Sequence, residues 1–267
     1  PAVYPAEWHA RALINASREI EAAAIARTTP AILAHVANLT PRDATTARSL
    51  SYCFVSAAMA LLHADDTEDA AQLFLRARDL ARSSVALDPA DIINTQGLGD
   101  ACRHLGKCLS TLERWPEAVD ALEESVSCHR KAISGRPGDA PVAAVLVLSL
   151  GDLTSAYVGA KRFSEAMQTA DESVSRQQSI LAADPMNVFA LNNGCIQNWG
   201  AAGAFRAASV EEGIDSSERT ARLTRALQFM DAAIALANRM KPADSERTLH
   251  LKQRLAMARA EIEAETR

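Results

Sequence analysis

Five residues in the middle of the chain have side chains that could bind zinc or take part in thiol chemistry: Cys102, His104, Cys108, Cys128 and His129. His104 and Cys108 are four residues apart and would share one face of a helix, as zinc ligands can. Cys102 and Cys128 fall near the facing ends of two successive helical patterns, so a redox pair is a second alternative. No Cys-x-x-Cys pair is present, and free cysteine is among the most commonly buried residues. We therefore interpret the cluster as packing residues, with the metal site and the redox pair as alternatives.

Signatures of other enzymes are missing from the sequence. Gly97, Gly99 and Gly106 lie inside a helical pattern with no strand before them, whereas a phosphate-binding loop follows a strand. The chain has no nucleophile elbow and no His-Glu-x-x-His pair. We therefore predict that this chain is not itself an enzyme and that it carries no metal and no cofactor.

The composition indicates closely packed helices. Apolar residues make up 48% of the chain and aromatic residues only 4%, and alanine fills much of the difference. Alanine is the best helix former and adds little bulk, so helices rich in it approach one another closely. The longest predominantly apolar run, residues 141–150, is about half of what a membrane span requires, and we expect no membrane insertion. The net charge of −5 argues against a nucleic-acid-binding protein.

The cysteines and the N-terminus bear on the compartment. The five cysteines are odd in number and spread through helical patterns, which favours a reducing compartment. The first residues lack the basic and apolar regions of a signal peptide, so we expect a cytoplasmic location. Because the sequence starts at Pro1 without a methionine, we also expect a longer protein, whose other segments could hold a catalytic domain, a targeting signal or a membrane anchor.

A repeat of 48 residues organises the chain. Prolines recur at this interval, each followed two residues later by a helix-capping residue: Pro41 with Asp43, Pro89 with Asp91, Pro137 with Asp139, and Pro185 with Asn187. An acidic residue followed by alanine recurs with the same period, at Ala22, Ala70, Ala118 and Ala166. Each unit contains a helical pattern, a short polar break and a second helical pattern that ends at the next proline. Because the interior shows no strand pair or hairpin turn, we predict an all-α fold of helix hairpins.

The ends depart from this regular pattern. A fifth proline–acid pair, Pro242 and Asp244, comes 57 residues after Pro185 and indicates an insertion near 206–215. Asp215 and Glu218 have the spacing of a capping box, which predicts a helix start after the insertion. The expected segments are N-terminal helices or a partial repeat at 1–42, four repeats at about 43–90, 91–138, 139–186 and 187–244, and an amphipathic capping helix at 245–267.

The repeat resembles the tetratricopeptide family. The third unit carries Leu153 and Tyr157, then Phe163 and Ala166, then Pro185, at positions through which the family packs helix against helix. The family's usual unit has 34 residues, so each helix here is longer by seven residues, or about two turns. The resemblance implies a right-handed superhelical solenoid of stacked antiparallel helix hairpins. This long variant is similar to repeat regions of bacterial multidomain signalling proteins such as serine/threonine kinases.

The resemblance also implies a groove for a partner on the concave side, which is lined by the first helix of each hairpin. Carried onto this sequence, the family's groove positions give as candidate binding residues Tyr52, Met59, Asp100, Arg103, Lys107, Asn192, Trp199 and Arg206. Further groove positions are Val55, Leu148, Gly151, Ser155, Ile196 and Gly203. Arg103 and Lys107 match the family's basic clamp for peptide carboxylates only in part, so we do not expect binding of an acidic C-terminal tail.

We expect a non-catalytic scaffold that binds a protein or peptide partner in this groove, or a second copy of itself, within a larger, bacterial signalling protein. An alternative is a small-molecule sensing domain, in which Tyr52, Arg103 and Trp199 hold a ligand that controls an attached enzyme such as a serine/threonine kinase. An enzyme with an unfamiliar site is a third hypothesis. A deep polar pocket closed by the insertion would favour sensing, whereas an open groove with an exposed apolar stripe would favour peptide binding.

Overall fold

A computed structural model describes residues 41–240 and 246–266, together with the isolated positions 24 and 28. The expected N-terminal helices and the pair Pro242 and Asp244 lie outside these residues. The described part of the chain contains nine α-helices and no strand. In order they are α3 (Ala44–His63), α4 (Thr67–Leu87), α5 (Ile92–Thr111), α6 (Trp115–Gly135), α7 (Ala140–Gly159), α8 (Phe163–Ala183), α9 (Val188–Ala208), α10 (Ser216–Arg239) and α11 (Glu246–Thr266).

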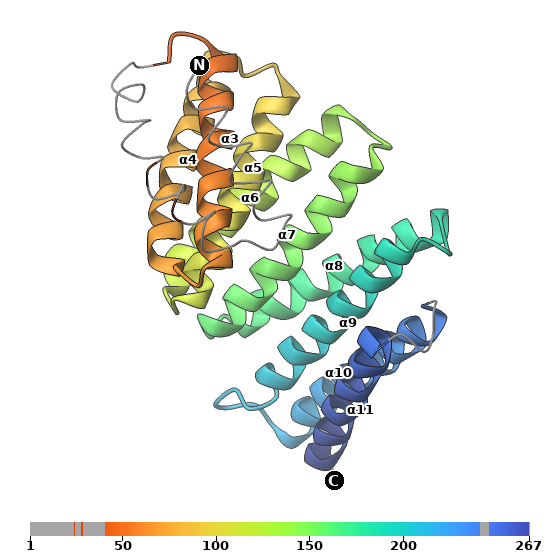
Figure 1. Ribbon diagram of the computed structural model, residues 1–267. Coiled ribbons are helices and arrows are strands. Elements are labelled where there is room, and N and C mark those ends of the chain that lie inside the picture. Colours follow the sequence, from red (N-terminus) through yellow and green to blue (C-terminus); the bar gives the residue numbers. More distant parts are fainter. Residues whose placement is uncertain (1–23, 25–27, 29–40, 241–245, 267) are drawn as a thin grey trace. The chain divides into compact units, whose positions relative to one another are not determined.

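The helices belong to two compact units, which divide between Pro137 and Gly138. In unit 1, which holds α3 to α6, each helix packs against the next, and α3 also contacts α5. In unit 2, which holds α7 to α11, the same sequential packing recurs, and α7 also contacts α9. Each unit is thus a stack of helix hairpins whose first helices lie side by side (Figure 1). The predicted all-α, solenoid-like arrangement is confirmed.

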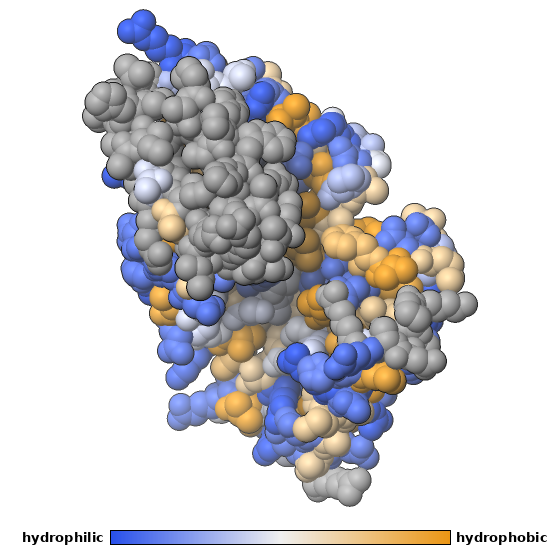
Figure 2. All heavy atoms as spheres, in the orientation of Figure 1, coloured by the Kyte–Doolittle hydropathy of each residue, from blue (hydrophilic) through white to orange (hydrophobic). Residues whose placement is uncertain are grey.

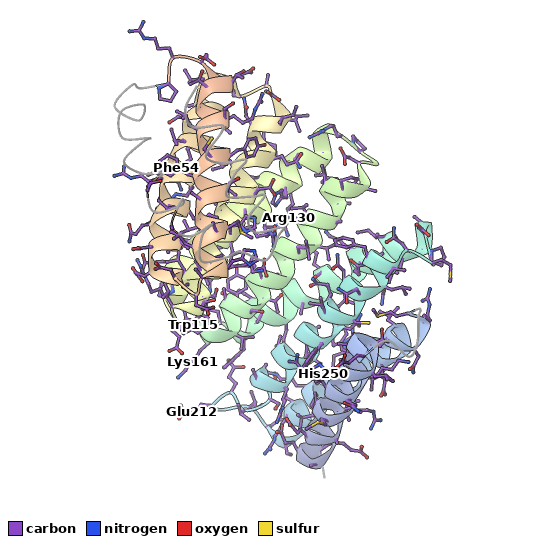
Figure 3. The ribbon with its side chains drawn as sticks, in the orientation of Figure 1. Phe54, Trp115, Arg130, Lys161, Glu212 and His250 are labelled. Carbon is purple, nitrogen blue, oxygen red and sulfur yellow. The ribbon has the colours of Figure 1, made fainter. Side chains whose placement is uncertain are left out.

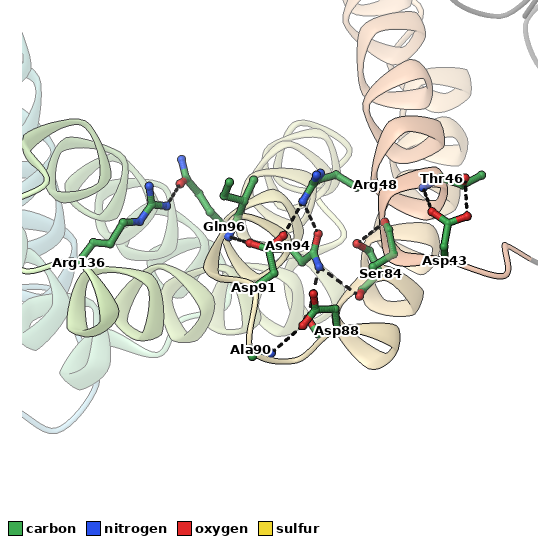
Figure 4. A network of polar contacts seen from close by, with 12 residues as sticks. Asp43, Thr46, Arg48, Ser84, Asp88, Ala90, Asp91, Asn94, Gln96 and Arg136 are labelled. Carbon is green, nitrogen blue, oxygen red and sulfur yellow. Dashed lines mark hydrogen bonds and ion pairs between the residues drawn. The ribbon is translucent and has the colours of Figure 1, made fainter.

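The predicted helix caps are confirmed in every described hairpin. The capping side chain accepts a backbone N–H from the first turn of its helix: Asp43 from Thr46 at 2.7 Å, Asp91 from Ile93 at 2.8 Å, Asp139 from Val142 at 3.2 Å and Asn187 from Ala190 at 2.9 Å. Figure 4 shows the first two of these caps. After the insertion, Asp215 accepts the N–H of Glu218 at 2.8 Å, as its spacing predicts. Each cap satisfies a donor that the start of a helix leaves without a partner.

The turns between the helices of a hairpin repeat with the same period. Asp65, Glu113 and Lys161 have φ values of 58°, 58° and 59°, in the left-handed region, and lie 48 residues apart. The next residue in each turn donates its N–H back to the last turn of the first helix, as Arg114 does to the carbonyl of Leu109 at 2.9 Å. Figure 3 shows Lys161 in the turn between α7 and α8. This turn normally favours glycine, so three side chains are held here in a costly conformation.

A polar bond joins the two helices of each hairpin at the same height. A hydroxyl donates to a backbone carbonyl in three hairpins: Ser51 to Ala77, Ser125 to Gly99 and Ser173 to Val147. In the fourth, the thiol of Cys195, a weaker donor, bonds to the carbonyl of Ala233. In the first three hairpins the bonded positions keep the 48-residue period, although the donor lies on the first helix in one and on the second helix in two. Serine and cysteine side chains are short. They can reach a carbonyl of the facing helix only if the two helices lie very close.

Small residues make this approach possible. The recurring alanines Ala70, Ala118 and Ala166 near the start of the second helices are all fully buried. At Gly106 a Cβ atom would lie 2.4 Å from the side chain of Leu122, so only glycine fits there. The alanine-rich composition is therefore the result of helix contact along every hairpin.

Helix α11 closes unit 2. It occupies the place of another first helix, and a shift of 57 residues aligns Lys252 with Cys195 and Arg259 with Ala202. The two earlier residues are buried, whereas Arg259 is partly exposed and pairs with Asp231 at 2.6 Å. Charged residues at these positions keep the outer side of α11 in contact with water, as the end of a repeat stack requires.

Helix α7 is the most apolar helix of the described chain. It is long and apolar enough to cross a membrane by length and composition, with a mean hydropathy of 1.6 over its best window, of which 50% is buried. The length of the apolar run in the sequence did not reveal this property. Asp152 limits that run, but one charged residue changes the mean hydropathy of the helix little. A core helix of a soluble protein passes the same test, so the property is weak evidence of a membrane span.

Replacing Glu113 by glycine should raise the free energy of unfolding by about 0.5–1 kcal/mol, because glycine adopts the left-handed turn without the Cβ penalty. Urea denaturation of the two proteins measures this change. The control Gln72→Gly, in the exposed middle of α4, should instead lower the stability by about 0.5–1 kcal/mol. A destabilised Glu113→Gly protein would contradict our account of the turns.

Candidate functional site

The predicted groove residues fall on the solvent-facing side of the first helices, which we call the first-helix face of each unit. Tyr52 on α3 is 40% exposed and Ile196 on α9 is 47% exposed, while Asp100 on α5 and Leu148 on α7 are partly exposed. These four residues occupy one position of the repeat, 48 residues apart. The face is therefore defined by the same register as the caps and turns.

On the first-helix face of unit 1, charged side chains satisfy one another. Nη1 of Arg48 lies 2.8 Å from Oδ2 of Asp91 and 2.8 Å from Oδ1 of Asn94, which links α3 to the start of α5 (Figure 4). Asn94 in turn donates to the carbonyls of Ser84 and Asp88 at the end of α4. This network fixes consecutive hairpins of unit 1 to each other.

Tyr52 and Asp100 lie close together on this face, as the carried-over positions suggest. Partial burial and, second, the carboxylate of Asp100 raise the pKa of Tyr52. The phenol lies over Gly97, where a Cβ atom would come within 3.3 Å of its oxygen. Arg103 and the exposed Lys107 continue the face along α5, and Met59 is the partly exposed residue of α3 at the position of Lys107. The face of unit 1 thus carries charged and polar side chains beside Tyr52 and Ile93, which are 40% and 48% exposed.

Beneath this face lies a chain of three polar groups that the sequence did not reveal. Nε2 of His129 is 3.2 Å from Oδ1 of Asp100, and Nδ1 of His129 is 3.4 Å from the hydroxyl of Ser125. A hydrolase triad has the same order of groups, but Ser125 and His129 are both fully buried. Ser125 also donates its proton to the carbonyl of Gly99 at 2.8 Å. These contacts hold α6 against α5 and orient Asp100.

The other histidine of the sequence cluster has a packing role. His104 stacks on Phe74 of the neighbouring α4, with ring centroids 5.4 Å apart and an interplanar angle of 12°. Burial and, second, the charge of Arg103 lower the pKa of His104 to about 4. Among residues 41–240 and 246–266, no three His, Cys, Asp or Glu side chains are placed to hold a metal ion.

The cysteines of the cluster are free thiols. Cys102 donates to Oε2 of Glu124 at 3.2 Å, and Glu124 pairs with Arg82 of α4 at 2.6 Å. Burial and, second, the Glu124 carboxylate raise the pKa of Cys102, and they raise that of Cys128 to about 11. Burial raises the pKa of Cys108 to about 12. Such thiols are poor nucleophiles and disfavour the redox alternative.

The first-helix face of unit 2 is almost uncharged. Helices α7 and α9 have 20 and 21 residues, and their only charged residues are Asp152 and Arg206. They pack closely, since a Cβ atom on Gly151 would lie 2.3 Å from Oε1 of Gln197. Phe189 at the start of α9 is 60% exposed, and Figure 2 shows apolar side chains near the turn between α8 and α9. Large apolar side chains thus remain open to water here.

Two of the predicted binding residues on α9 contact α11 of the same unit. The guanidinium of Arg254 lies over the ring of Trp199, 4.7 Å from its centroid. Arg206 pairs with Glu261 at 2.9 Å and with Glu265 at 2.5 Å. The charge of Arg206 is therefore neutralised within the chain, whereas Asn192 remains partly exposed toward the start of α9. Sequence reasoning missed these partners, which lie some 55 residues further along the chain.

Two glycines of α9 leave open space on this face. Gly200 and Gly203 are exposed, and a Cβ atom on either would meet nothing within 4 Å. Glycine in the interior of a helix costs about 0.5–1 kcal/mol relative to alanine. No contact among the described residues explains why these positions are not alanine.

The insertion does not cover this face. Arg222 of α10 holds it by an ion pair with Glu211 at 2.6 Å and by a bond to the carbonyl of Ala208. A separate hollow of about 610 Å³ lies along the first half of α10 and is open to solvent. Its lining consists of Ser216, Ser217, Thr220, Ala221, Thr224, Arg225 and Gln228. Neither feature is a deep polar pocket closed by the insertion, the arrangement that would favour the sensing alternative.

Gly99→Ala should destabilise the protein by about 1–3 kcal/mol, because the new Cβ would lie 2.7 Å from Nε2 of the buried His129. Thermal or urea denaturation measures the loss. Gly203→Ala is the matched control: the same change in open space should raise stability by about 0.5–1 kcal/mol. Equal effects of the two substitutions would show that the His129 contact does not constrain α5.

In the folded protein at about pH 8, iodoacetamide should modify Cys102, Cys108 and Cys128 at less than about a tenth of the rate seen in urea. Their raised pKa values leave little thiolate at this pH, and the rate at Cys128 should keep rising until the pH approaches 11. Mass spectrometry of proteolytic peptides identifies each modified thiol. Fast modification of Cys128, or a Cys102–Cys128 disulfide after mild oxidation, would instead support the redox pair.

Comparison with known proteins adds no relative: no family model and no curated protein matches the chain. The evidence for the 48-residue repeat is therefore its periodic helix caps, turns and interhelical bonds. The tetratricopeptide resemblance remains an expectation drawn from the sequence, and the two first-helix faces are the features from which a function can be inferred.

Proposed function

We propose that this chain is a non-catalytic binding module that holds a protein or peptide partner on the first-helix face of unit 2. The observation that carries the proposal is the side-by-side pair α7 and α9, in which Asp152 and Arg206 are the only charged residues. On this pair Phe189 and Ile196 are 60% and 47% exposed. Exposed apolar patches on a soluble domain mark interaction sites, and aromatic residues are favoured at interface centres.

The open glycines support the same proposal. Gly200 and Gly203 reduce the stability of α9, and nothing within the described chain makes use of the space they leave. A partner whose backbone or side chains enter that space would make the glycines useful. Sites that bind ligands commonly sacrifice some stability in this way.

The first-helix face of unit 1 has a different chemistry. Its Arg48 is engaged by Asp91, and Asp100 is engaged by His129, so part of its charge is used within the unit. Lys107 is exposed at the far end of α5. We assign this face a secondary, polar contribution to partner binding. The placement of the module in a cytoplasmic, bacterial signalling protein rests on the sequence resemblance alone.

Selection from a phage-displayed library of random peptides tests the proposal without assuming the sequence of the partner. Peptides selected on the wild-type protein should bind Ile196→Glu at least about tenfold more weakly, because a buried interface cannot accommodate an unpaired carboxylate. Gly203→Leu should weaken the same peptides while the protein keeps its thermal stability. Fluorescence anisotropy of the selected peptides gives the dissociation constants.

The control is Val210→Glu, the same change at a residue that is 70% exposed in the turn after α9. It should bind the selected peptides like the wild type. If no peptide is enriched, or if Ile196→Glu binds as well as Val210→Glu, the face of unit 2 is not a binding surface.

A further inference from the structure

We propose that the partner segment is an acidic amphipathic helix, which lays its apolar side along α9 and pairs a carboxylate with Arg254. This inference rests on the proposed function and adds the chemistry of the ligand. It depends on a cation that lacks a carboxylate partner within the described chain, on a nearly uncharged helix and on the space above two glycines.

Several arginines of the described chain lie over aromatic rings. Three do so in the described chain: Arg162 over Tyr157, Arg225 over Phe229 and Arg254 over Trp199. Arg162 also pairs with Glu165 at 2.9 Å, and Arg225 pairs with Asp171 at 2.9 Å. Arg254, which is exposed, has no carboxylate partner among the described residues.

A guanidinium held on an aromatic face is prepared to bind a carboxylate. A guanidinium carries five N–H donors, so one that lies over a ring keeps donors that match two carboxylate oxygens. Stacking also restricts the side chain in advance, so less entropy is lost on binding. For Arg162 and Arg225, the chain itself supplies the carboxylate. For Arg254, we assign the carboxylate to the partner.

The acidic residues that follow Arg254 on α11 are engaged by another arginine. Glu261 and Glu265 of α11 are both within 2.9 Å of Arg206, and this group of three keeps a net charge of −1. Both glutamates are held by Arg206, and they lie about two and three helical turns beyond Arg254. Helix α9 contains no acidic residue at all. Figure 3 locates this part of α11 by His250, one turn before Arg254. A carboxylate approaching Trp199 therefore meets attraction from Arg254 and no acid on α9.

The shape of the surface favours a helix. Phe189, Ile196 and Trp199 follow one another on one side of α9 over ten residues, or about 15 Å, which is the length of about three helical turns. Gly200 and Gly203 lie one turn apart on the same helix and leave room for a close approach. A partner helix could therefore pack at short interaxial distance, with its apolar side on Ile196 and an acidic residue at Arg254.

Three synthetic helical peptides of about 18 residues test the inference, since shorter isolated helices are only marginally stable. All share one apolar stripe, and the residues flanking it are Glu, Gln or Lys. Fluorescence anisotropy with the full chain should give about tenfold tighter binding for the Glu peptide than for the Gln peptide, and weaker binding still for the Lys peptide. Added salt should reduce the Glu preference.

Matched variants assign the preference to its residue. Arg254→Gln should bind the Glu and Gln peptides equally, and Arg254→Lys should keep only part of the preference because an ammonium lacks the two parallel N–H donors of a guanidinium. The control Arg219→Gln removes another exposed cation, on α10, and should keep the wild-type preference. Circular dichroism and thermal melting of each variant confirm that its fold is intact.

The outcomes separate this inference from the proposed function. If wild type binds the Glu and Gln peptides equally, or prefers the Lys peptide, while Ile196→Glu still abolishes binding, the acidic-helix inference is wrong and the binding face stands. If the peptides bind but Arg254→Gln keeps the full preference, Arg254 is not the anchor. If wild type binds none of the peptides but binds phosphatidylcholine vesicles in an Ile196-dependent way, the face contacts lipid and both proposals fail.

Discussion

The close contact between the two helices of each hairpin is the constraint on which the rest of the structure depends. A hydroxyl or thiol on one helix reaches a carbonyl of the other, as Ser125 reaches Gly99, and this requires small residues along the contact. Buried alanines and glycines such as Gly106 allow it. Each first helix packs against its own second helix, and α5 and α9 also pack against the preceding second helix and the preceding first helix. Only one side of these helices then remains for solvent. The candidate binding residues lie on that remaining side.

The two units use this remaining side differently. In unit 1 charged side chains pair with one another, since Arg48 meets Asp91 and His129 supports Asp100, beside the exposed Tyr52 and Ile93. In unit 2 the equivalent side is apolar, with Ile196 exposed and the glycines of α9 uncovered. Exposed apolar area and helix-interior glycines both lower stability in isolation. Their presence together in unit 2, but not in unit 1, is the basis of the proposed binding function.

Much of the fold could be predicted because it depends on local chemistry. Asp43, Asp139 and Asn187 cap helices where the 48-residue spacing places them, and the position shared by Tyr52 and Ile196 faces solvent. The partners of the candidate site could not be predicted, because they come from segments distant in the sequence. The capping helix α11 brings Arg254 to Trp199 and Glu261 to Arg206, and the insertion before α10 hides that register in the sequence. The left-handed turns were also hidden, because Asp65, Glu113 and Lys161 stand where glycine is usual.

Hydrogen–deuterium exchange of the full chain with and without a bound acidic helical peptide tests the central claim most directly. Exchange reports which backbone amides become protected when a ligand covers or stabilises a segment. Our account predicts slower exchange in α9 and in the part of α11 around Arg254, with no change along the exposed first half of α10. Protection confined to the α10 hollow or to α3 and α5, with α9 unaffected, would contradict it.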